Sequence, residues 1–458
     1  MAALTKNEKH PDYTEGSIMR SILGMGLPSM VGFLTQNIYA LVDTWWVSRL
    51  PDGEAAVAAL TFFNVILMLL FSFNNLVGPG SVAVISRRYG EKSYALTEKA
   101  IKETLLLKLV FGFLFGIIGF FFTENLLKLV GAEGEVLKMG VEYGQIWLLA
   151  LGLPYATYSV FTALRSVANP RMAMTLMFSS NILNMLLDPL FIFGYLGFPA
   201  MGIRGAAVAS MISFALTFTV GLFLLYTGRA NIRLHLRGEA KVSMETMWRL
   251  IQIGIPAWMG SLAWSGARVV IAPMIATFGM AVVAAYGVGM QVVSFGVMVI
   301  VGIGLGLSSL IGHNLGAEKT ERAKKTGDQA ILLSIVMMMA MAVFVFVFAR
   351  FITTCFFDAP QTVAYGVTLL RIMALALPFI GIFIMIEEIH VGVGLNAPMM
   401  IFSVIHSWAL QVVPIFLLIT FLDITQTAVW WTLLAADIVG TVMVYMYYRR
   451  GRWLTVKV

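Results

Sequence analysis

Long apolar stretches, separated by short polar loops, recur along the whole chain. Each is long enough to cross the hydrocarbon core of a bilayer, which takes about 20 mostly apolar residues. The fold class that this pattern predicts is an all-α, polytopic membrane protein. The twelve expected membrane-spanning helices lie at residues 20–49, 55–85, 98–122, 136–163, 170–194, 203–227, 245–275, 281–311, 326–350, 362–389, 397–421 and 426–448.

Basic residues gather in every second loop and in the tail. Arg87, Arg88 and Lys92 follow the second predicted helix, and Arg449 and Arg450 follow the last one. Cytoplasmic loops are enriched in Lys and Arg, and an even number of spans returns the chain to its starting side. We therefore expect a multi-pass protein of the cell membrane with both termini in the cytoplasm.

The composition agrees with a membrane protein. Hydrophobic residues make up 59% of the chain and charged residues 12%, about half of the roughly 25% found in soluble domains. The net charge of +7 is attributed to cytoplasmic loops rather than to nucleic-acid binding. The single cysteine, Cys355, excludes an internal disulfide and a cysteine-based metal site. The polar stretch from Met1 to Ser17 predicts that no signal peptide is removed.

Short motifs recur at an offset of about half the chain. The sequence GLP at Gly26–Pro28 returns as GIP at Gly254–Pro256, and RRYGEK at Arg87–Lys92 aligns with HNLGAEK at His313–Lys319. Repeats of this kind mark transporters that place the substrate between two halves. We expect two pseudo-symmetric six-helix lobes joined by a linker. Their predicted bounds are 1–230 for the N-terminal lobe, 231–244 for the cytoplasmic linker and 245–458 for the C-terminal lobe.

A triplet of two polar residues and one acid, at positions i, i+3 and i+7, occurs twice within apolar segments. It comprises Gln36, Tyr39 and Asp43 in the first predicted helix, and Asn181, Asn184 and Asp188 in the fifth. This spacing places each triplet on one helix face. Both helices run in the same direction, and both acids lie about six residues before the outer end. The two faces are therefore expected at one depth, around a shared cavity.

An acid within the membrane is costly and usually functional. A carboxylate near a second carboxylate in a low dielectric binds a proton more readily, whereas carboxylate and amide oxygens can instead hold Na⁺. The candidate ligands for such an ion are Asp43, Asn184 and Asp188. A purely structural role for both acids is the alternative. Pro28 interrupts the first helix, either as a static bend or as a hinge for the half that carries Asp43.

The second half lacks this cluster but carries other charges within its apolar segments. They are Arg268, Arg371, Glu387 and Glu388, together with His390 and His406. A buried Arg–Glu pair is the favoured interpretation, and a second cation or substrate site is the alternative. The sequence contains no phosphate-binding loop and no catalytic constellation, so we expect neither an enzyme nor a cofactor.

Three stretches resemble the multidrug and toxic compound extrusion (MATE) family, and in particular its prokaryotic DNA-damage-inducible branch. They are Gly26–Ser48, LRSVANPRMAM at Leu164–Met174 and NILNMLLDPLFIFG at Asn181–Gly194. At the position of the family's sixth-helix threonine, the chain has Ala206 or Ala207. The acid that the sodium-type branch carries early in its seventh helix is absent from 254–270.

The resemblance implies a multidrug antiporter that exports organic, often cationic, compounds in exchange for protons or Na⁺. It assigns cation coupling to Asp43 and Asp188 with Asn184, and it places Gln36, Tyr39, Tyr143 and Asn181 around the cavity, with a bend at Pro28. The expected partners are small cationic or amphipathic compounds and membrane lipid, without nucleic acid, and the protein is expected to be a monomer. The alternatives are a flippase for lipids or lipid-linked sugars, which would need a basic cavity, and a channel.

Overall fold

The computed structural model describes residues 12–235, 242–422 and 424–456. Residues 1–11, 236–241, 423 and 457–458 lie outside this description. The predictions for the first part of the polar N-terminal segment and for the middle of the linker therefore fall on residues that the structure does not describe.

The described residues form helices and no strand. Eleven helical segments are long and apolar enough to cross a membrane, and one bent pair of helices supplies a twelfth. The all-α fold class with twelve spans is thus confirmed. Nine spans are single helices: α1 (Ile18–Val47), α4 (Tyr94–Leu129), α7 (Pro170–Phe193), α8 (Ile203–Thr227), α9 (Met244–Ala276), α10 (Met280–Gly316), α11 (Thr320–Thr354), α12 (Pro360–Val393) and α15 (Gln426–Arg449).

Three spans that the sequence predicted as continuous are interrupted. They consist of α2 (Gly53–Asn74) with α3 (Gly78–Gly90), α5 (Gly134–Leu149) with α6 (Gly152–Ser166), and α13 (Ala397–Val404) with the π-helix η2 (Ile405–Val412) and α14 (Val413–Phe421). Pro79 lies in the first turn of α3, where its missing N–H is tolerated. The α5–α6 pair bends by 52°. Two short 3₁₀ helices, η1 (Tyr195–Gly197) and η3 (Arg452–Thr455), complete the described elements.

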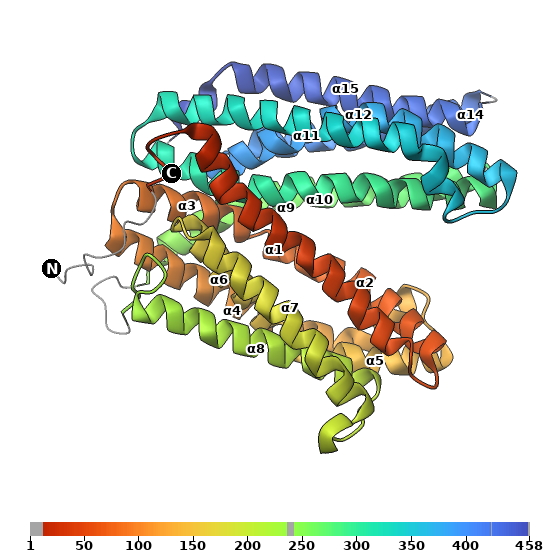
Figure 1. The fold of residues 1–458 in the computed structure, drawn as a ribbon, viewed down its shortest axis with the longest axis horizontal. Helices are drawn as coiled ribbons and strands as arrows, with labels where there is room; N and C mark the ends of the chain where they lie inside the picture. Colours follow the sequence, from red (N-terminus) through yellow and green to blue (C-terminus); the bar gives the residue numbers. More distant parts are fainter. Residues whose placement is uncertain (1–11, 236–241, 423, 457–458) are drawn as a thin grey trace.

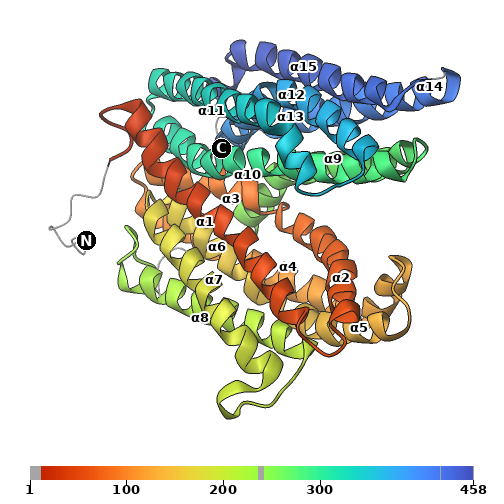
Figure 2. The ribbon, with the colours of Figure 1, turned by 45° about the vertical axis from the view of Figure 1, so that its right-hand side comes forward.

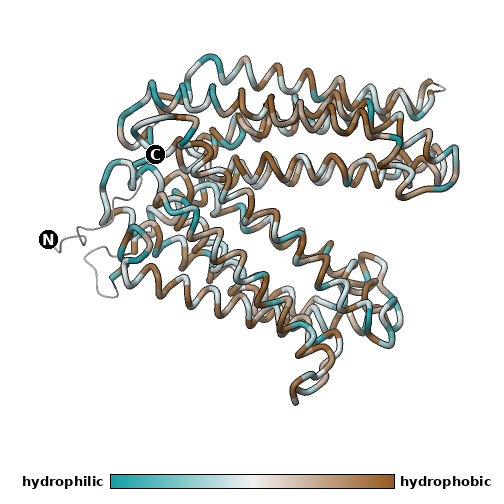
Figure 3. The backbone as a smooth tube through the Cα atoms, in the orientation of Figure 1, coloured by the Kyte–Doolittle hydropathy of each residue, from teal (hydrophilic) through white to brown (hydrophobic). Residues whose placement is uncertain are grey.

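The helices gather into two bundles, one containing α2 to α8 and the other α9 to α15 (Figures 1 and 2). The described part of the chain begins and ends on one side of the molecule, which we call the terminal side, and the bundles diverge toward the other, which we call the open side. Hydrophobic residues dominate the middle of the helices, and hydrophilic ones gather in the loops (Figure 3). Large apolar side chains such as Phe121 and Phe351 are exposed, as expected of surfaces that face lipid.

The bundles meet closely on the terminal side, where α3 crosses α10. A Cβ atom added at Gly90 of α3 would clash with the backbone of His313, and one added at Gly316 of α10 would clash with the backbone of Arg87. Glycine therefore allows the two helices to touch. His313 is buried, and its Nε2 lies 2.7 Å from the carbonyl oxygen of Ser166 at the end of α6. This contact joins the two bundles.

Helix α1 packs against both bundles. Near its start, Gly26 lies against Ile303 of α10. Farther along, Gly32 lies against Met177 of α7. Pro28 falls between these two contacts, within one uninterrupted helix, and Met30, two residues later, still lies against Gly302 of α10. The first part of α1 is thus held by the C-terminal bundle and the later part by the N-terminal bundle.

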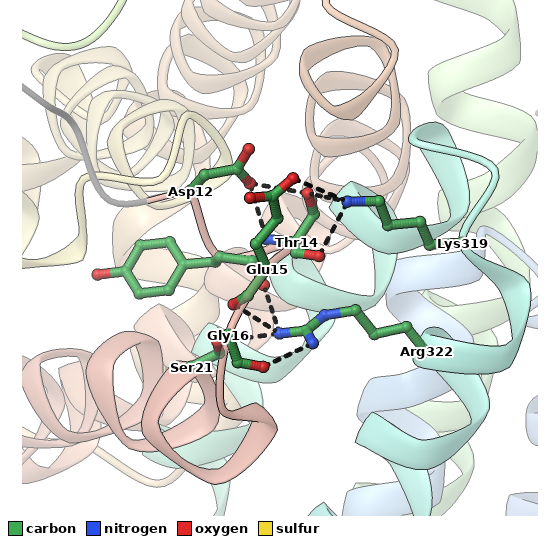
Figure 4. A network of polar contacts seen from close by, with 8 residues as sticks. Asp12, Thr14, Glu15, Gly16, Ser21, Lys319 and Arg322 are labelled. Atoms are coloured by element: carbon green, nitrogen blue, oxygen red, sulfur yellow. Dashed lines mark hydrogen bonds and ion pairs between the residues drawn. The ribbon is translucent and has the colours of Figure 1, made fainter.

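The segment before α1 is tied to the start of α11 (Figure 4). Lys319 Nζ donates to the carbonyl and hydroxyl oxygens of Thr14, both at 3.1 Å. The Arg322 guanidinium donates to the Gly16 carbonyl oxygen at 2.9 Å and to that of Glu15 at 3.0 Å. Burial raises the pKa of Asp12, but hydrogen bonds from Thr14 and the nearby charges of Lys319 and Lys92 together leave that pKa below its ordinary value. These contacts add to the closure of the terminal side.

Candidate functional site

A cavity of about 230 Å³ lies in the N-terminal bundle. Residues of α1, α2, α5, α6, α7 and α8 line it. Five of the predicted site residues are among them, namely Gln36, Tyr39, Asp43, Tyr143 and Asn181. The lining contains no Lys or Arg among the described residues. The structure therefore brings these side chains together around a cavity in which the only charged wall residue, within the described part of the chain, is an acid.

Asp43 is the acid in the cavity wall. Its side chain lies four residues before the end of α1 and is buried, with 7% of its surface exposed. Its Oδ1 atom has no hydrogen-bond partner among the described residues. A buried polar atom without a partner is costly, and more so in a medium of low dielectric. An unsatisfied carboxyl oxygen in this position is poised to bind a proton or a cationic ligand.

Asp188 lies behind the cavity wall and is completely buried. Asn184, one turn earlier on α7, reaches it when the amide is oriented so that each atom meets a complementary partner. The Asn184 Nδ2 then donates to Asp188 Oδ2 at 3.1 Å, and its Oδ1 accepts from the hydroxyl and the backbone N–H of Ser210, at 3.2 and 3.1 Å. Asn184 thus fixes one face of the Asp188 carboxyl group.

Ser210 connects the two predicted polar faces. Its Oγ is hydrogen-bonded to the Tyr39 hydroxyl at 3.0 Å, so a chain of hydrogen bonds runs from α1 through α8 to Asn184 and Asp188 on α7. The sequence analysis missed this residue and noted only Ala206 and Ala207, which are buried in the core. Ser210 lies one turn after Ala206, on the same side of α8. That spacing is the signal that would have identified it.

The two acids act on each other. Asp43 and Asp188 lie close enough for their carboxyl groups to interact electrostatically. Tyr39 and Tyr143 are within electrostatic reach of both. Two carboxyl groups in such a place do not readily carry two negative charges. The arrangement can take up and release one positive charge, either a proton on one carboxyl group or a cation near both.

The other predicted residues hold the cavity walls in place. Gln36 Nε2 donates to the Tyr158 hydroxyl at 2.7 Å, and Asn181 Nδ2 donates to Thr35 Oγ1 at 3.0 Å. Several cavity-lining residues were not predicted, because they belong to apolar segments without a distinctive spacing. They include Asn64, Phe71, Trp147, Tyr158, Ser180 and Phe214.

In the C-terminal bundle, the expectation of a buried Arg–Glu pair is wrong. The Arg268 guanidinium lies 3.8 Å from the ring centre of Trp264. Arg371 is exposed and lies over Phe346 at 5.4 Å. Neither arginine is ion-paired with Glu387 or Glu388 in the described chain, because an aromatic ring on a neighbouring turn or helix holds each guanidinium instead.

The two histidines of this bundle bond differently. His390 is buried, and its Nδ1 is 2.8 Å from the carbonyl oxygen of Ile386. His406, within the π-helix η2, lies 2.9 Å from Asp437 of α15. His406, Asp437, Glu387 and Arg268 line a second cavity, of about 340 Å³. No group of three or more His, Cys, Asp or Glu side chains that could hold a metal ion occurs in the described part of the chain.

Comparison with known proteins gives consistent similarities. The family model MatE matches residues 28–190 and 256–417, one segment in each half of the chain. The multidrug export protein MepA of Staphylococcus haemolyticus is 26% identical over 454 residues, which cover 98% of each chain. The probable multidrug resistance protein YoeA of Bacillus subtilis is 26% identical and covers 94% of each chain.

Solved structures share the fold. A crystal structure described as MATE in the bent conformation superposes with a TM-score of 0.90, at 23% identity, over 98% of this chain and 99% of that one. The outward-facing conformation of a multidrug resistance transporter superposes with a TM-score of 0.88, at 22% identity and with the same coverage.

Proposed function

Because the chain belongs to the MatE family of multidrug transporters, we propose that it is a multidrug efflux antiporter of the cell membrane. In this proposal it exports small organic compounds, often cationic, in exchange for protons. Members of the family are transporters rather than enzymes, in agreement with the sequence-based prediction. The proposal includes cytoplasmic termini and a monomer in contact with lipid. The described state is then open toward the outside.

One observation carries the proposal: among the residues that the structure describes, Asp43 Oδ1 has no hydrogen-bond partner and lies in the wall of a cavity that no Lys or Arg lines. An ionised carboxyl group there attracts an organic cation into the cavity. Protonation of the coupled pair, Asp43 and Asp188, removes that attraction and favours release. A transporter needs only that proton and drug prefer different states of the protein. Pro28 supports the change of state, since it interrupts the hydrogen bonding of α1 close to where the contacts of this helix pass from α10 to α7.

A proton fits the site better than Na⁺ does. A sodium ion at Asp43, Asn184 and Asp188 would need the oxygen of Asn184 as a ligand. In the satisfied orientation that oxygen faces Ser210, and the amide NH₂ group faces Asp188. Binding Na⁺ would therefore require the amide to turn, which breaks the hydrogen bonds to Asp188 Oδ2 and to the Ser210 backbone N–H and keeps only a bond to Ser210 Oγ. A proton on a carboxyl oxygen requires no such rearrangement.

A flippase for lipids or lipid-linked sugars would need a basic cavity to hold a phosphate group. The N-terminal cavity has an acid in its wall instead, and in the larger second cavity Arg268 is accompanied by Glu387, Glu388 and Asp437. The charge of the cavity favours export of cationic compounds over the flippase alternative.

The test uses purified protein in liposomes with ethidium, a permanently charged dye that does not redistribute as a weak base. A pH gradient alone and a Na⁺ gradient alone are imposed on wild type, Asp43→Asn and Asp188→Asn. We expect the pH gradient to drive ethidium flux in wild type, and each substitution to reduce it at least about tenfold, equivalent to about 1.4 kcal/mol.

Asp358→Asn is the matched control, because Asp358 is exposed between α11 and α12. It should transport as wild type does. Flux that survives both Asp43→Asn and Asp188→Asn would refute the proposed coupling site. Flux driven by Na⁺ but not by protons would replace the proton with Na⁺ as the coupling ion.

A further inference from the structure

The segment that follows α15, residues 451–456, folds back under the C-terminal bundle, and we call it the tail. It begins at Gly451, whose left-handed conformation (φ 68°) glycine adopts without strain. Trp453 is buried in the hydrophobic core of this bundle, with 1% of its surface exposed. Its ring stacks on Tyr448 of α15, with ring centres 5.4 Å apart, and its Nε1 donates to the Tyr448 carbonyl oxygen at 3.2 Å. The tail is thus anchored to the C-terminal bundle.

The far end of the tail reaches the N-terminal bundle. Arg87, near the end of α3, donates through Nη2 to the carbonyl oxygen of Val456 at 2.7 Å. Hydrogen bonds from a charged donor are stronger than those between neutral groups. The Nη1 atom of Arg87 is buried without a partner in the described chain. Glu91, one turn later, lies within electrostatic reach of the guanidinium, but no ion pair joins the two among the residues described. Arg87 is therefore directed at the tail.

The internal repeat places Arg87 and His313 at equivalent positions. Each lies three residues before the glycine at which α3 and α10 touch, Gly90 in α3 and Gly316 in α10. His313 of the C-terminal bundle bonds to the carbonyl oxygen of Ser166 in the N-terminal bundle. Arg87 makes the reverse connection, from the N-terminal bundle to a carbonyl oxygen that follows the last helix of the C-terminal one. The tail therefore supplies the second half of a symmetric pair of links across the terminal side.

The two ends of this link are carried by different bundles. On the N-terminal side, Thr104 of α4 donates through its hydroxyl group to Ser81 Oγ of α3 at 3.0 Å, which fixes α3 within its own bundle. On the C-terminal side, Val456 packs at the edge of the hydrophobic cluster that contains Trp453. A state that is open on the terminal side requires α3 to move away from α10, and hence away from the tail. Either the bond between Arg87 and Val456 then breaks, or Trp453 leaves its buried position.

We propose that the tail is a strap that keeps the terminal side closed. Trp453 fastens it to the C-terminal bundle, and Arg87 fastens it to the N-terminal bundle. Both attachments stabilise the described state, and opening of the terminal side costs the free energy of one of them. Release of the tail therefore shifts the protein toward the state that is open on the terminal side. The inference concerns this equilibrium alone and holds whichever ion or compound the protein carries.

The test measures how fast a buried cysteine between α3 and α10 is alkylated. Ser309 of α10 is 1% exposed, and its hydroxyl has no partner in the described chain. It precedes Gly312 and Gly316, which contact α3, by three and seven residues and so lies on the same helix face. The full chain with Cys355→Ser and Ser309→Cys, the parent variant, is treated with N-ethylmaleimide in nanodiscs. When opening is faster than alkylation, the rate is proportional to the population of the open state.

Both attachments of the strap are removed, singly and together. Arg87→Gln should raise the alkylation rate at least about tenfold, as the loss of a charged hydrogen bond implies. Trp453→Ala frees the other end of the same strap and should raise the rate by a similar factor or more. The double variant should stay within about twofold of the faster single variant, because a strap that is released at one end no longer acts through the other. Two independent contributions would instead multiply.

Arg88→Gln is the matched control for the loss of an arginine at the end of α3. The Nη1 atom of Arg88 donates to the Leu96 carbonyl oxygen at 3.3 Å, within the N-terminal bundle, so this variant should react as the parent does. Arg87→Lys keeps a charged donor but not the planar guanidinium and should restore part of the slow rate. Should Trp453→Ala fail to fold, Trp453→Phe keeps a ring on Tyr448 without the Nε1 hydrogen bond and should raise the rate in part.

An unchanged rate in Arg87→Gln overturns the inference, and so does an equal increase in Arg88→Gln, which would reflect the loss of any positive charge. A double variant whose effect is the product of the single effects also overturns it, because Arg87 and Trp453 would then stabilise separate parts of the molecule. Ethidium flux in liposomes made from the same preparations keeps the two proposals apart. Faster alkylation without ethidium flux in wild type refutes the proposed function alone, and ethidium flux with unchanged alkylation refutes this inference alone.

Discussion

The contact between α3 and α10 determines how stable the described state is, and Gly316→Ala tests it directly. The new methyl group would lie 2.9 Å from the carbonyl carbon of Arg87 and 3.0 Å from the backbone nitrogen of Glu91. Both atoms belong to the backbone, at the end of α3 and just after it, so no side-chain rotation relieves the clash. The two bundles must separate on the terminal side.

The expected size of the effect follows from overpacking, which costs about 1–3 kcal/mol in a close-packed interface. The better helix propensity of alanine does not offset this cost, because α10 is expected to stay helical in every state of the transporter. The equilibrium should shift toward a state that is open on the terminal side. Because each 1.4 kcal/mol changes an equilibrium constant about tenfold, a cost of about 1–3 kcal/mol corresponds to a shift of about 5- to 140-fold.

The assay measures the distance between spin labels on the open side by double electron–electron resonance. Leu129→Cys at the end of α4 and Met280→Cys at the start of α10 are both suitable, as each residue is 82% exposed. Cys355 is exposed and is replaced by serine first. We expect wild type to show a long distance and Gly316→Ala to show a shorter population.

Gly287→Ala provides the matched control on the same helix. A Cβ at Gly287 would meet nothing within 4 Å, so its distance distribution should equal that of wild type. If Gly316→Ala also gives the wild-type distribution and melting temperature, the interpretation of the α3–α10 contact as the closure of the terminal side is refuted.

Three further predictions concern single side chains. Ser210→Ala should lower the free energy of unfolding by about 1–3 kcal/mol, because Tyr39 and Asn184 each lose a hydrogen bond worth about 0.5–1.5 kcal/mol. Thermal melting measures this, and Ser213→Ala, whose hydroxyl is buried without a partner in the described chain, should melt as wild type does. Pro28→Ala should slow ethidium exchange without weakening ethidium binding, since it restores a helix hydrogen bond at the expected hinge; exchange at the wild-type rate would show that the bend is static. Arg322→Ala should speed hydrogen exchange of residues 13–17 about 10- to 100-fold, if its charged hydrogen bonds contribute about 1.5–3 kcal/mol; unchanged exchange in mass spectrometry would contradict this.

Hydropathy and spacing predicted most of the fold and the core of the candidate site. Apolar length alone located all twelve spans, because a bilayer sets a minimum length for each helix. The i, i+3, i+7 spacing placed Tyr39 and Asp43 on one face and Asn184 and Asp188 on another, and the structure brings the two faces together. Whether these residues couple transport to a cation is still a prediction.

The sequence could not indicate features that depend on tertiary packing. The breaks between α2 and α3 and between α5 and α6 are much shorter than a membrane span, so a prediction from apolar length alone passes over them. The π-helix around His406 is more polar than its neighbours, but composition does not distinguish a π-helix from an α-helix. A carboxylate partner was predicted for Arg268 because a buried arginine is usually paired with an acid. In the structure its guanidinium lies instead over the ring of Trp264, four residues earlier. Cavities form only when several helices meet, and no single segment encodes them.

The position of α1 between two bundles has a consequence for the biogenesis of the protein. Met25 lies against Gly306 of α10, which is synthesised about 280 residues later. At translation rates of about 5–20 residues per second, the first helix waits roughly 14–56 s for this partner. During that interval its small-residue surface is available to lipid or to the insertion machinery. The N-terminal half therefore cannot complete its folding while it is being made, and a ribosome that stalls before α10 leaves the first helix without its final neighbour.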